Sequence, residues 1–487
     1  MDLRPTMDRN RLFRLCFFIL LAAAFCLYAY YRRRFIGACD WYGYFQLGRL
    51  FGEGRIFLDV PLPPDIYPAI VPLGFLTDGA HVLPQYPPGY PLLLGIASWF
   101  GAEFFVTPVV GLVSIVLIYF AAREFAERWI SLAVAAIWAF FPIVIYGSTE
   151  VMSDLVAAVP LLGSYLLYRK GWLRTSALVL GTAFWVRPTN VLYAVVFAGV
   201  LLRDRQLVRY VLWTVPTVAL YAAYNTILFG APWNTGYGDF ANSLSPHVFW
   251  SFLGFYSWQT VLHLAALVPF VLIGLRRGRR SEIVFLAAWA AAYLLFYCFW
   301  ISSGDKWWWT RFLLPSYPAF FLLAANGLQQ TADWLRRWRD TDGARSASFA
   351  ALAALVAGML YFEISLSLSF SHTGLLSTNK GRDFYNVVCT VDKLVPAGSY
   401  IGSVEFCGAH RLYSSNQPFQ AWHPNAPTLV RDLLARHTPV FLIVEPWNRT
   451  NETIRTLLDT NTAELVHELK PFGGVRVYRL TPKPPQG

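Results

Sequence analysis

Residues 104–122 read FFVTPVVGLVSIVLIYFAA, contain no charged side chain and are followed at once by Arg123. As an α-helix, this run rises by about 30 Å, the thickness of the hydrocarbon core of a bilayer. Similar runs recur along the chain, so that 56% of its 487 residues are hydrophobic and only 14% are charged. Soluble domains average about 25% charged residues. Solid apolar blocks also exclude a transmembrane barrel, whose strands alternate in polarity. The sequence therefore predicts an α-helical polytopic membrane protein.

About eleven apolar runs are expected to span the membrane. Their approximate ranges are 12–31, 104–122, 130–147, 153–168, 175–190, 191–202, 210–229, 258–275, 283–301, 311–328 and 347–367. The segment 32–102 between the first two runs is rich in Pro, Gly and aromatic residues, and we interpret it as a long outer loop. Its apolar end, 88–101, is short for a span and predicts a helix at the membrane interface.

Basic residues gather in alternate loops between these runs. The loops are 123–128, 169–174, 203–209, 276–280 and 336–345. By the positive-inside rule these loops are cytoplasmic, so we expect a cytoplasmic N-terminus in a multi-pass protein of a bacterial inner or plasma membrane. The arginines at positions 32–34 contradict this topology, because it places them outside. Since the other arginines lie at the ends of spans, the net charge of +11 does not indicate nucleic-acid binding.

The chain is expected to divide into a transmembrane part, 1–368, and a soluble extracytoplasmic part, 369–487. The second part has no spanning run. Short β-type runs at 399–404, 439–444 and 474–480 alternate there with helical stretches at 428–436 and 451–458. This alternation predicts a small α/β domain. Cys389 and Cys407 lie in it, and they are equally well interpreted as a disulfide or as two free thiols.

Three acidic residues near the ends of spans are candidates for chemistry, because charge close to lipid is costly. Asp40 follows the first span and precedes an amphipathic stretch, so it is interpreted either as a helix N-cap or as a functional carboxylate. Glu150 and Asp154 are four residues apart and would share one face of a helix. Two like charges on one face suit a metal, a cationic partner or a shared proton. The alternative is compensation of the helix dipole.

Three cations lie on the side of the membrane that should be poor in them: Arg187, Lys306 and Arg311. Cations at the interface can hold a lipid phosphate, and the alternative is that they snorkel to the headgroups. Carboxylates can serve as a general base or hold a metal, and cations can stabilise a leaving phosphate. Together, these residues indicate transfer of a group from a lipid phosphate, and a divalent cation stays open as a cofactor.

Four motifs in this order resemble those of the type C glycosyltransferases, polytopic enzymes that use lipid-linked sugars. The resemblance is nearest to the protein O-mannosyltransferases and the aminoarabinose transferases. The motifs are residues 40–50 with 85–94 (DWYGYFQLGRL and QYPPGYPLLL), 152–155 (MSDL), 181–190 (GTAFWVRPTN) and 311–318 (RFLLPSYP). Many relatives have a second acid where this chain has Trp41, which weakens the case for a metal at Asp40.

The resemblance implies a role for each candidate residue. Asp40 would be the base, supported by Asp154, with Glu150 as the second choice. The residues that would bind the substrate, and above all the donor phosphate, are Arg187, Lys306, Arg311, Tyr44 and Tyr86. The expected reaction moves a sugar from a polyprenyl phosphate to a hydroxyl of a glycan, lipid or protein acceptor, with inversion, on the extracytoplasmic face. The alternatives are a transporter or flippase of lipid-linked glycans, and a binding or scaffolding protein that acts through its C-terminal domain.

Overall fold

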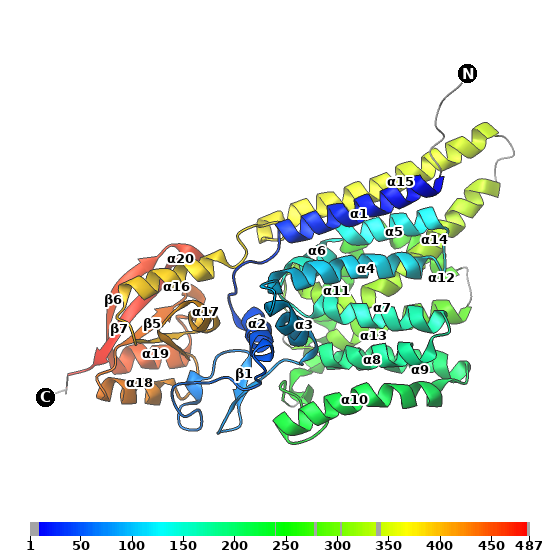
Figure 1. Ribbon diagram of the computed structural model, residues 1–487. Helices are drawn as coiled ribbons and strands as arrows, with labels where there is room; N and C mark the ends of the chain where they lie inside the picture. The colour runs from blue at the N-terminus through cyan, green and yellow to red at the C-terminus, as the bar shows by residue number, and fades with distance from the viewer. Residues whose placement is uncertain (1–8, 239, 277–279, 302–303, 338–341, 485–487) are drawn as a thin grey trace.

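Long apolar helices form one half of the molecule, shown on the right of Figure 1. The computed structural model describes residues 9–238, 240–276, 280–301, 304–337 and 342–484. Within these residues, five helical segments are long and apolar enough to cross a membrane, or up to seven if each of two bent pairs is one span. The five segments contain α1 (Arg9–Tyr30), α4 (Val106–Ala122), α10 (Leu207–Phe229), α13 (Arg280–Tyr297) and α15 (Asp342–Ser369), and those of α4 and α15 run over Glu103–Ala122 and Ala350–Thr373.

The bent pairs and shorter helices account for the other predicted spans. The pairs are α5 (Arg128–Phe140) with α6 (Pro142–Thr149), bent by 61°, and α11 (Phe249–His263) with α12 (Val268–Arg276), bent by 99°. The remaining helices are α7 (Asp154–Arg169), α8 (Leu173–Val186), α9 (Val191–Arg203) and α14 (Tyr317–Arg337). Each predicted span thus coincides with a helix or a pair, but the count of eleven is not confirmed. Helix α9, with 13 residues, rises by only about 20 Å.

The break between α5 and α6 is caused by Pro142, which has no N–H to donate to the preceding turn. Two carbonyl groups at the break accept side-chain hydrogen bonds instead. The hydroxyl of Tyr28 donates to the carbonyl of Ala139 over 2.6 Å, and that of Ser367 donates to Phe140 over 3.2 Å. Helices α1 and α15 therefore stabilise a bend that sets the direction of α6, and with it the position of the acidic segment that follows.

Short elements of the first outer loop cover the end of the bundle next to the C-terminal region (Figure 1). They are helices α2 (Cys39–Gly52) and α3 (Gly89–Ser98), and the antiparallel strands β1 (Phe75–Thr77) and β2 (Val82–Pro84). Helix α3 lies where a short interfacial helix was predicted. The two helices pack against each other, and α3 also packs against α8. The loop is thus held on the bundle through α3.

The C-terminal region is built on a five-stranded mixed sheet in the order β4-β3-β5-β7-β6. The strands are β3 (Tyr400–Ser403), β4 (Gln417–Gln420), β5 (Val440–Val444), β6 (Asn461–Leu469) and β7 (Val475–Pro482). Strand β3 is parallel to β4 and β5, while β7 is antiparallel to β5 and β6. The accompanying helices are α16 (Arg382–Leu394), α17 (Cys407–Tyr413), α18 (Ala426–Ala435), α19 (Glu452–Thr460) and the short α20 (Pro471–Gly474). Cys389 and Cys407 are free thiols in this structure.

The sheet region docks on the first outer loop through close contacts. The hydroxyl of Tyr413 accepts a hydrogen bond of 2.8 Å from the backbone N–H of Ile36, and that of Tyr67 donates to Asp432 over 3.0 Å. Gly408 on α17 lies against the fully buried ring of Tyr42 on α2, so that a Cβ atom at this glycine would lie 2.5 Å from Cγ of Tyr42. The backbone of helix α17 therefore packs directly against the N-terminal turn of α2.

Replacing Gly408 with Ala should weaken this docking, because the added methyl group overlaps the Tyr42 ring. Overpacking of this kind costs about 1–3 kcal/mol of stability. Thermal unfolding in detergent, together with limited proteolysis of the segment between α15 and α16, measures the effect. Gly358→Ala on α15 is the matched control, since a Cβ atom there meets nothing within 4 Å. Equal melting temperatures for the two variants would contradict the proposed contact.

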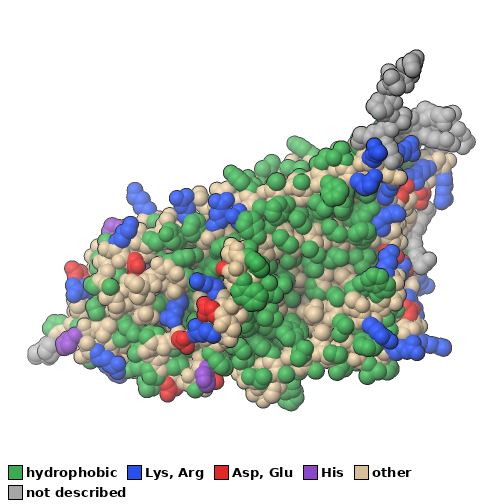
Figure 2. All heavy atoms as spheres, in the orientation of Figure 1, with side chains coloured by type: hydrophobic (Ala, Val, Ile, Leu, Met, Phe, Trp, Pro, Cys, Tyr) green, Lys and Arg blue, Asp and Glu red, His purple; other side chains and the backbone are tan. Residues whose placement is uncertain are grey.

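Lysine and arginine side chains gather at the end of the bundle far from the sheet, at the right of Figure 2. The helix ends that border the five basic loops predicted to share one side lie at this end of Figure 1. Three of their arginines, Arg277, Arg279 and Arg339, lie outside the described residues. The arrangement supports the predicted topology, in which the sheet and the first outer loop share the opposite, extracytoplasmic side; this orientation stays a proposal.

Candidate active site

Asp40 lies in the first turn of α2, at the junction of the first outer loop, the bundle and the sheet region. The N-cap of this helix is Ala38, so the interpretation of Asp40 as an N-cap is wrong. Its carboxylate instead accepts a hydrogen bond of 2.7 Å from the hydroxyl of Tyr86 and lies 3.1 Å from Nη2 of Arg311. The side chain is 38% exposed, so that it is fixed by two partners and still open to an incoming molecule.

Asp154 forms a second ion pair close to the first. It lies in the first turn of α7, and its Oδ1 is 2.9 Å from Nη2 of Arg187, which follows the end of α8. The pair is more deeply buried than that of Asp40, with 3% of the Asp154 side chain and 12% of the Arg187 side chain exposed. The preceding Ser153 shares a hydrogen bond of 2.8 Å with the hydroxyl of Tyr44 on α2. The segment before α7 is thereby tied to the helix that carries Asp40.

The two arginines lie on the same aromatic ring. The guanidinium carbons of Arg187 and Arg311 are 5.4 and 5.2 Å from the centre of the Phe312 ring. Arg311 belongs to the 3₁₀ helix Trp307–Ser316, and its Nη1 also contacts the sulfur of Met152 at 2.6 Å. Two buried guanidinium groups beside one ring bring two positive charges into the same region, which favours binding of an anion there.

Each arginine keeps a buried N–H group without a hydrogen-bond partner: Nε of Arg311 and Nη1 of Arg187. Buried polar groups are almost always hydrogen-bonded, so orphaned donors mark places where a ligand or water binds. Here the orphaned donors belong to cations, which makes an anionic oxygen the best partner. The arrangement can therefore bind an anion next to the partly exposed carboxylate of Asp40.

Tyr44 and Tyr86 line the same site from the first outer loop. Their ring centres are 4.3 Å apart, and Tyr86 also contacts Tyr237 edge to face at 6.2 Å. Burial raises the pKa of Tyr44 to about 12, and burial together with the nearby charge of Asp40 raises the pKa of Tyr86 well above its ordinary value. Both hydroxyls therefore remain protonated at neutral pH. Tyr86 is a permanent donor that orients the Asp40 carboxylate.

Glu150 lies apart from Asp154, and the expectation that the two share a helix face is wrong. Helix α6 ends at Thr149 and α7 begins at Asp154, so Glu150 is in extended backbone between them. Its carboxylate lies 2.6 Å from Nε of Arg33 and 3.2 Å from Nζ of Lys380. Burial raises the pKa of Glu150, but these two cations outweigh the burial, and its pKa lies below the usual value.

Lys306 is not brought to the other candidate residues. Its ammonium group lies 3.6 Å from the exposed carboxylate of Asp305, and 58% of its side chain is exposed. Two residues of the site region were missed by the sequence analysis: Arg33, which was noticed only as a topological conflict, and Lys380, which nothing in its polar surroundings distinguishes. The described residues contain no group of three or more His, Cys, Asp and Glu side chains that could hold a metal ion.

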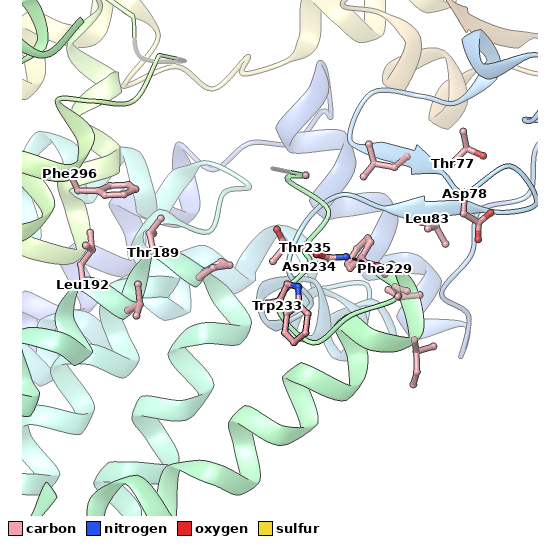
Figure 3. A pocket seen from close by; sticks show the side chains of 17 residues that line it. Thr77, Asp78, Leu83, Thr189, Leu192, Phe229, Trp233, Asn234, Thr235 and Phe296 are labelled. Carbon is pink, nitrogen blue, oxygen red and sulfur yellow. Dashed lines mark hydrogen bonds between the residues drawn. The ribbon is translucent and has the colours of Figure 1, made fainter. Parts of the chain in front are cut away.

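A cavity of about 990 Å³ lies next to the site (Figure 3). Pro188 and Thr189, which follow Arg187 directly, form part of its wall. Most of its lining is apolar and comes from the end of α10, the start of α9 and the loop 230–238, with Thr77 and Asp78 on the side of the first outer loop. Its size and lining suit an apolar chain whose polar end lies at the arginines.

No protein-family model and no curated protein sequence matches this chain. Several solved structures match it. ArnT from Cupriavidus metallidurans, bound to undecaprenyl phosphate, is 13% identical with a TM-score of 0.61 over 96% of this chain and 97% of its own. AglB, an oligosaccharyltransferase from Archaeoglobus fulgidus in complex with an inhibitory peptide and a dolichol-phosphate, is 12% identical, with a TM-score of 0.57 over 96% of this chain and 74% of its own.

The arabinofuranosyltransferase AftD from Mycobacteria is also similar, at 12% identity and a TM-score of 0.52, over 98% of this chain and 42% of its own. All three proteins are glycosyltransferases of type C. At such low identity the likeness is one of fold, and it extends over nearly the whole chain, including the C-terminal region. The resemblance predicted from the four motifs is thereby confirmed: the chain has the fold of the type C glycosyltransferases.

Proposed function

We propose that the protein transfers a sugar from a polyprenyl-phosphate donor to a hydroxyl group of an acceptor, at the extracytoplasmic face of the membrane. The observation that carries the proposal is the pair of buried arginines, each with an orphaned N–H group, next to the Asp40 carboxylate. The fold supports it, because ArnT and AglB with the same fold have been solved with undecaprenyl phosphate and a dolichol-phosphate.

The donor would bind with its phosphate at the two arginines. An oxygen of the phosphate accepts from Nε of Arg311 and from Nη1 of Arg187, the donors that have no partner in the protein. The polyprenyl chain would lie in the apolar cavity behind Pro188 and Thr189. Asp154 already neutralises Arg187, and Asp40 already neutralises Arg311. The phosphate would therefore be bound chiefly by directed hydrogen bonds from the arginines.

The sugar would then lie toward Asp40, the most exposed charged group of the site. The Asp40 carboxylate takes the proton of an acceptor hydroxyl, whose oxygen attacks the anomeric carbon. The bond between that carbon and the phosphate oxygen breaks, and the electron pair leaves on the polyprenyl phosphate, where the arginines stabilise the growing charge. A single displacement of this kind inverts the anomeric centre. The acceptor would be a glycan, a lipid or a protein.

Binding of the donor lipid tests the phosphate site directly. Purified protein in lipid nanodiscs should bind undecaprenyl phosphate, and should bind undecaprenol, which has no phosphate, at least about tenfold more weakly, since a hydrogen bond to a charged group contributes about 1.5–3 kcal/mol. Arg311→Met should lose most of this difference. Lys306→Met is the matched control, because it removes a cation from the same segment but from an exposed position. Equal affinity for the two lipids in the wild-type protein would contradict the proposal.

A further inference from the structure

Glu150 is the centre of a buried ionic cluster that joins three distant segments of the chain. Arg33 follows α1, Glu150 follows α6, and Lys380 precedes α16. All three side chains are at most 6% exposed. Besides its contact with Glu150, the Lys380 ammonium donates a hydrogen bond of 2.6 Å to the hydroxyl of Thr149. The backbone N–H of Arg33 donates to the carbonyl of Thr149 over 2.8 Å, so that the cluster fixes the end of α6 from two sides.

The cluster contains two cations and one carboxylate, so Lys380 adds a net positive charge to it. Arg33 and Glu150 alone would be neutral. Burial and the neighbouring Arg33 lower the pKa of Lys380, which means that its charge is held at a cost. Some buried charges that add little net stability fix one specific arrangement, as a polar group in a core can fix one register among several.

The partners of the cluster lead directly to both candidate acids. Glu150 precedes Asp154 by four residues, at the end of α6. On the other side, the guanidinium carbon of Arg33 lies 3.7 Å from the centre of the Trp41 ring, and Trp41 follows Asp40 in α2. The cluster therefore contacts both the segment before Asp154 and the helix that carries Asp40.

The chain next to Lys380 is fitted to this arrangement. Gly381 has a backbone φ of +76°, which side chains other than glycine rarely adopt. A Cβ atom there would lie 2.2 Å from the carbonyl oxygen of Phe35 and 2.6 Å from Nη1 of Arg33. Residues 380 and 381 are thus packed closely against Phe35, Arg33 and the end of α6, with no room for a side chain at position 381.

We propose that Lys380 is a positioning residue of the active site. Through Glu150 and Arg33 it holds the segment before α7 and the N-terminal turn of α2 at the separation at which Asp40 and Asp154 serve one bound donor. The segment between the last membrane helix and the sheet region is therefore a working part of the site. This inference rests on the proposed function.

Kinetics of sugar transfer in nanodiscs distinguish positioning from general stabilisation. Lys380→Met leaves the Arg33–Glu150 pair intact, so the melting temperature should stay close to that of the wild type. We expect kcat to fall by about 100-fold, the cost of a displacement of about 1 Å at a reacting centre. The KM for the donor should change by less than about twofold, because both arginines of the phosphate site are untouched. Lys380→Arg should restore at least a third of the wild-type kcat.

Wild-type kcat in Lys380→Met, a fall in kcat that matches the unfolded fraction, or no recovery in Lys380→Arg would each overturn the inference. A control that needs no activity is the modification of Cys39 by a maleimide. Burial, and then the charge of Asp40, raises the pKa of this thiol to about 12, and its sulfur lies 3.6 Å from the Tyr86 hydroxyl. Modification of Cys39, followed by mass spectrometry, should be slow in the wild type and in Lys380→Arg, and at least about fivefold faster in Lys380→Met.

The maleimide experiment separates the two proposals. If the wild-type protein transfers no sugar but Lys380→Met still accelerates the modification of Cys39, the proposed function fails and the positioning of α2 by Lys380 stands. If the wild type transfers sugar and Lys380→Met changes neither kcat nor the modification rate, the proposed function stands and the role of Lys380 is overturned.

Discussion

Replacing Asp40 with Asn should lower the rate of sugar transfer by about 10³-fold, equivalent to about 4 kcal/mol in the activation free energy. The amide keeps the size of the side chain, and its oxygen can still accept the hydrogen bond from Tyr86. What it loses is the negative charge that takes the proton of the acceptor. The effect should appear in kcat, because the hydrogen-bond donors for the phosphate belong to Arg187 and Arg311.

The affinity for the donor provides the internal check on this variant. Without the Asp40 charge, Arg311 has one anionic partner fewer and is free to bind phosphate more strongly, so KM should stay constant or fall. Asp305→Asn is the matched control, since it neutralises an exposed acid near the same membrane face and should leave the rate within about twofold. Transfer of a radiolabelled sugar from the polyprenyl phosphate measures both variants. A fully active Asp40→Asn protein would exclude Asp40 as the base.

The sequence was sufficient to place the four charged residues of the site at one end of the bundle. Asp40, Asp154, Arg187 and Arg311 each lie next to the end of an apolar run, and the basic loops distinguish the two sides of the membrane. Their pairing was not predictable, because Asp40 and Arg311 are 271 positions apart and meet only after the bundle closes. The periodicity of apolar residues indicates which face of a helix is buried. It does not indicate which helix ends lie next to each other in the folded bundle.

Two local features of the chain differ from what its sequence pattern suggests. The spacing of Glu150 and Asp154 suggests one helix face, but α6 ends at Thr149, and four residues that are not helical, 150–153, precede the start of α7. Strands β4 and β6 were not predicted, and both are edge strands of the sheet. An edge strand needs no continuous apolar face, and β6 is exposed over most of its length, so its hydrophobic pattern is weak.

Replacing Arg187 with Met should be the most destabilising single change at the site. The variant leaves the carboxylate of Asp154, of which 3% is exposed, without its cationic partner. Breaking a buried ion pair in this way costs about 3–5 kcal/mol, because the remaining carboxylate stays out of water and has no cation to compensate for its lost hydration. We therefore expect a drop of many degrees in the melting temperature in detergent, together with loss of binding of the donor lipid.

The double variant Asp154→Leu with Arg187→Met separates the two consequences. Replacing a buried ion pair by apolar side chains of similar size is often neutral for stability, so most of the lost melting temperature should return. Binding of undecaprenyl phosphate should not return, because Nη1 of Arg187, one of the two orphaned donors of the site, is still missing.

If the double variant binds the lipid as the wild type does, Arg187 serves only to neutralise Asp154, and the phosphate must be held by Arg311 alone. If stability and binding both stay lost, the pair is structural in a way that apolar packing cannot replace. Recovery of stability without recovery of binding is the result that assigns Arg187 to the donor.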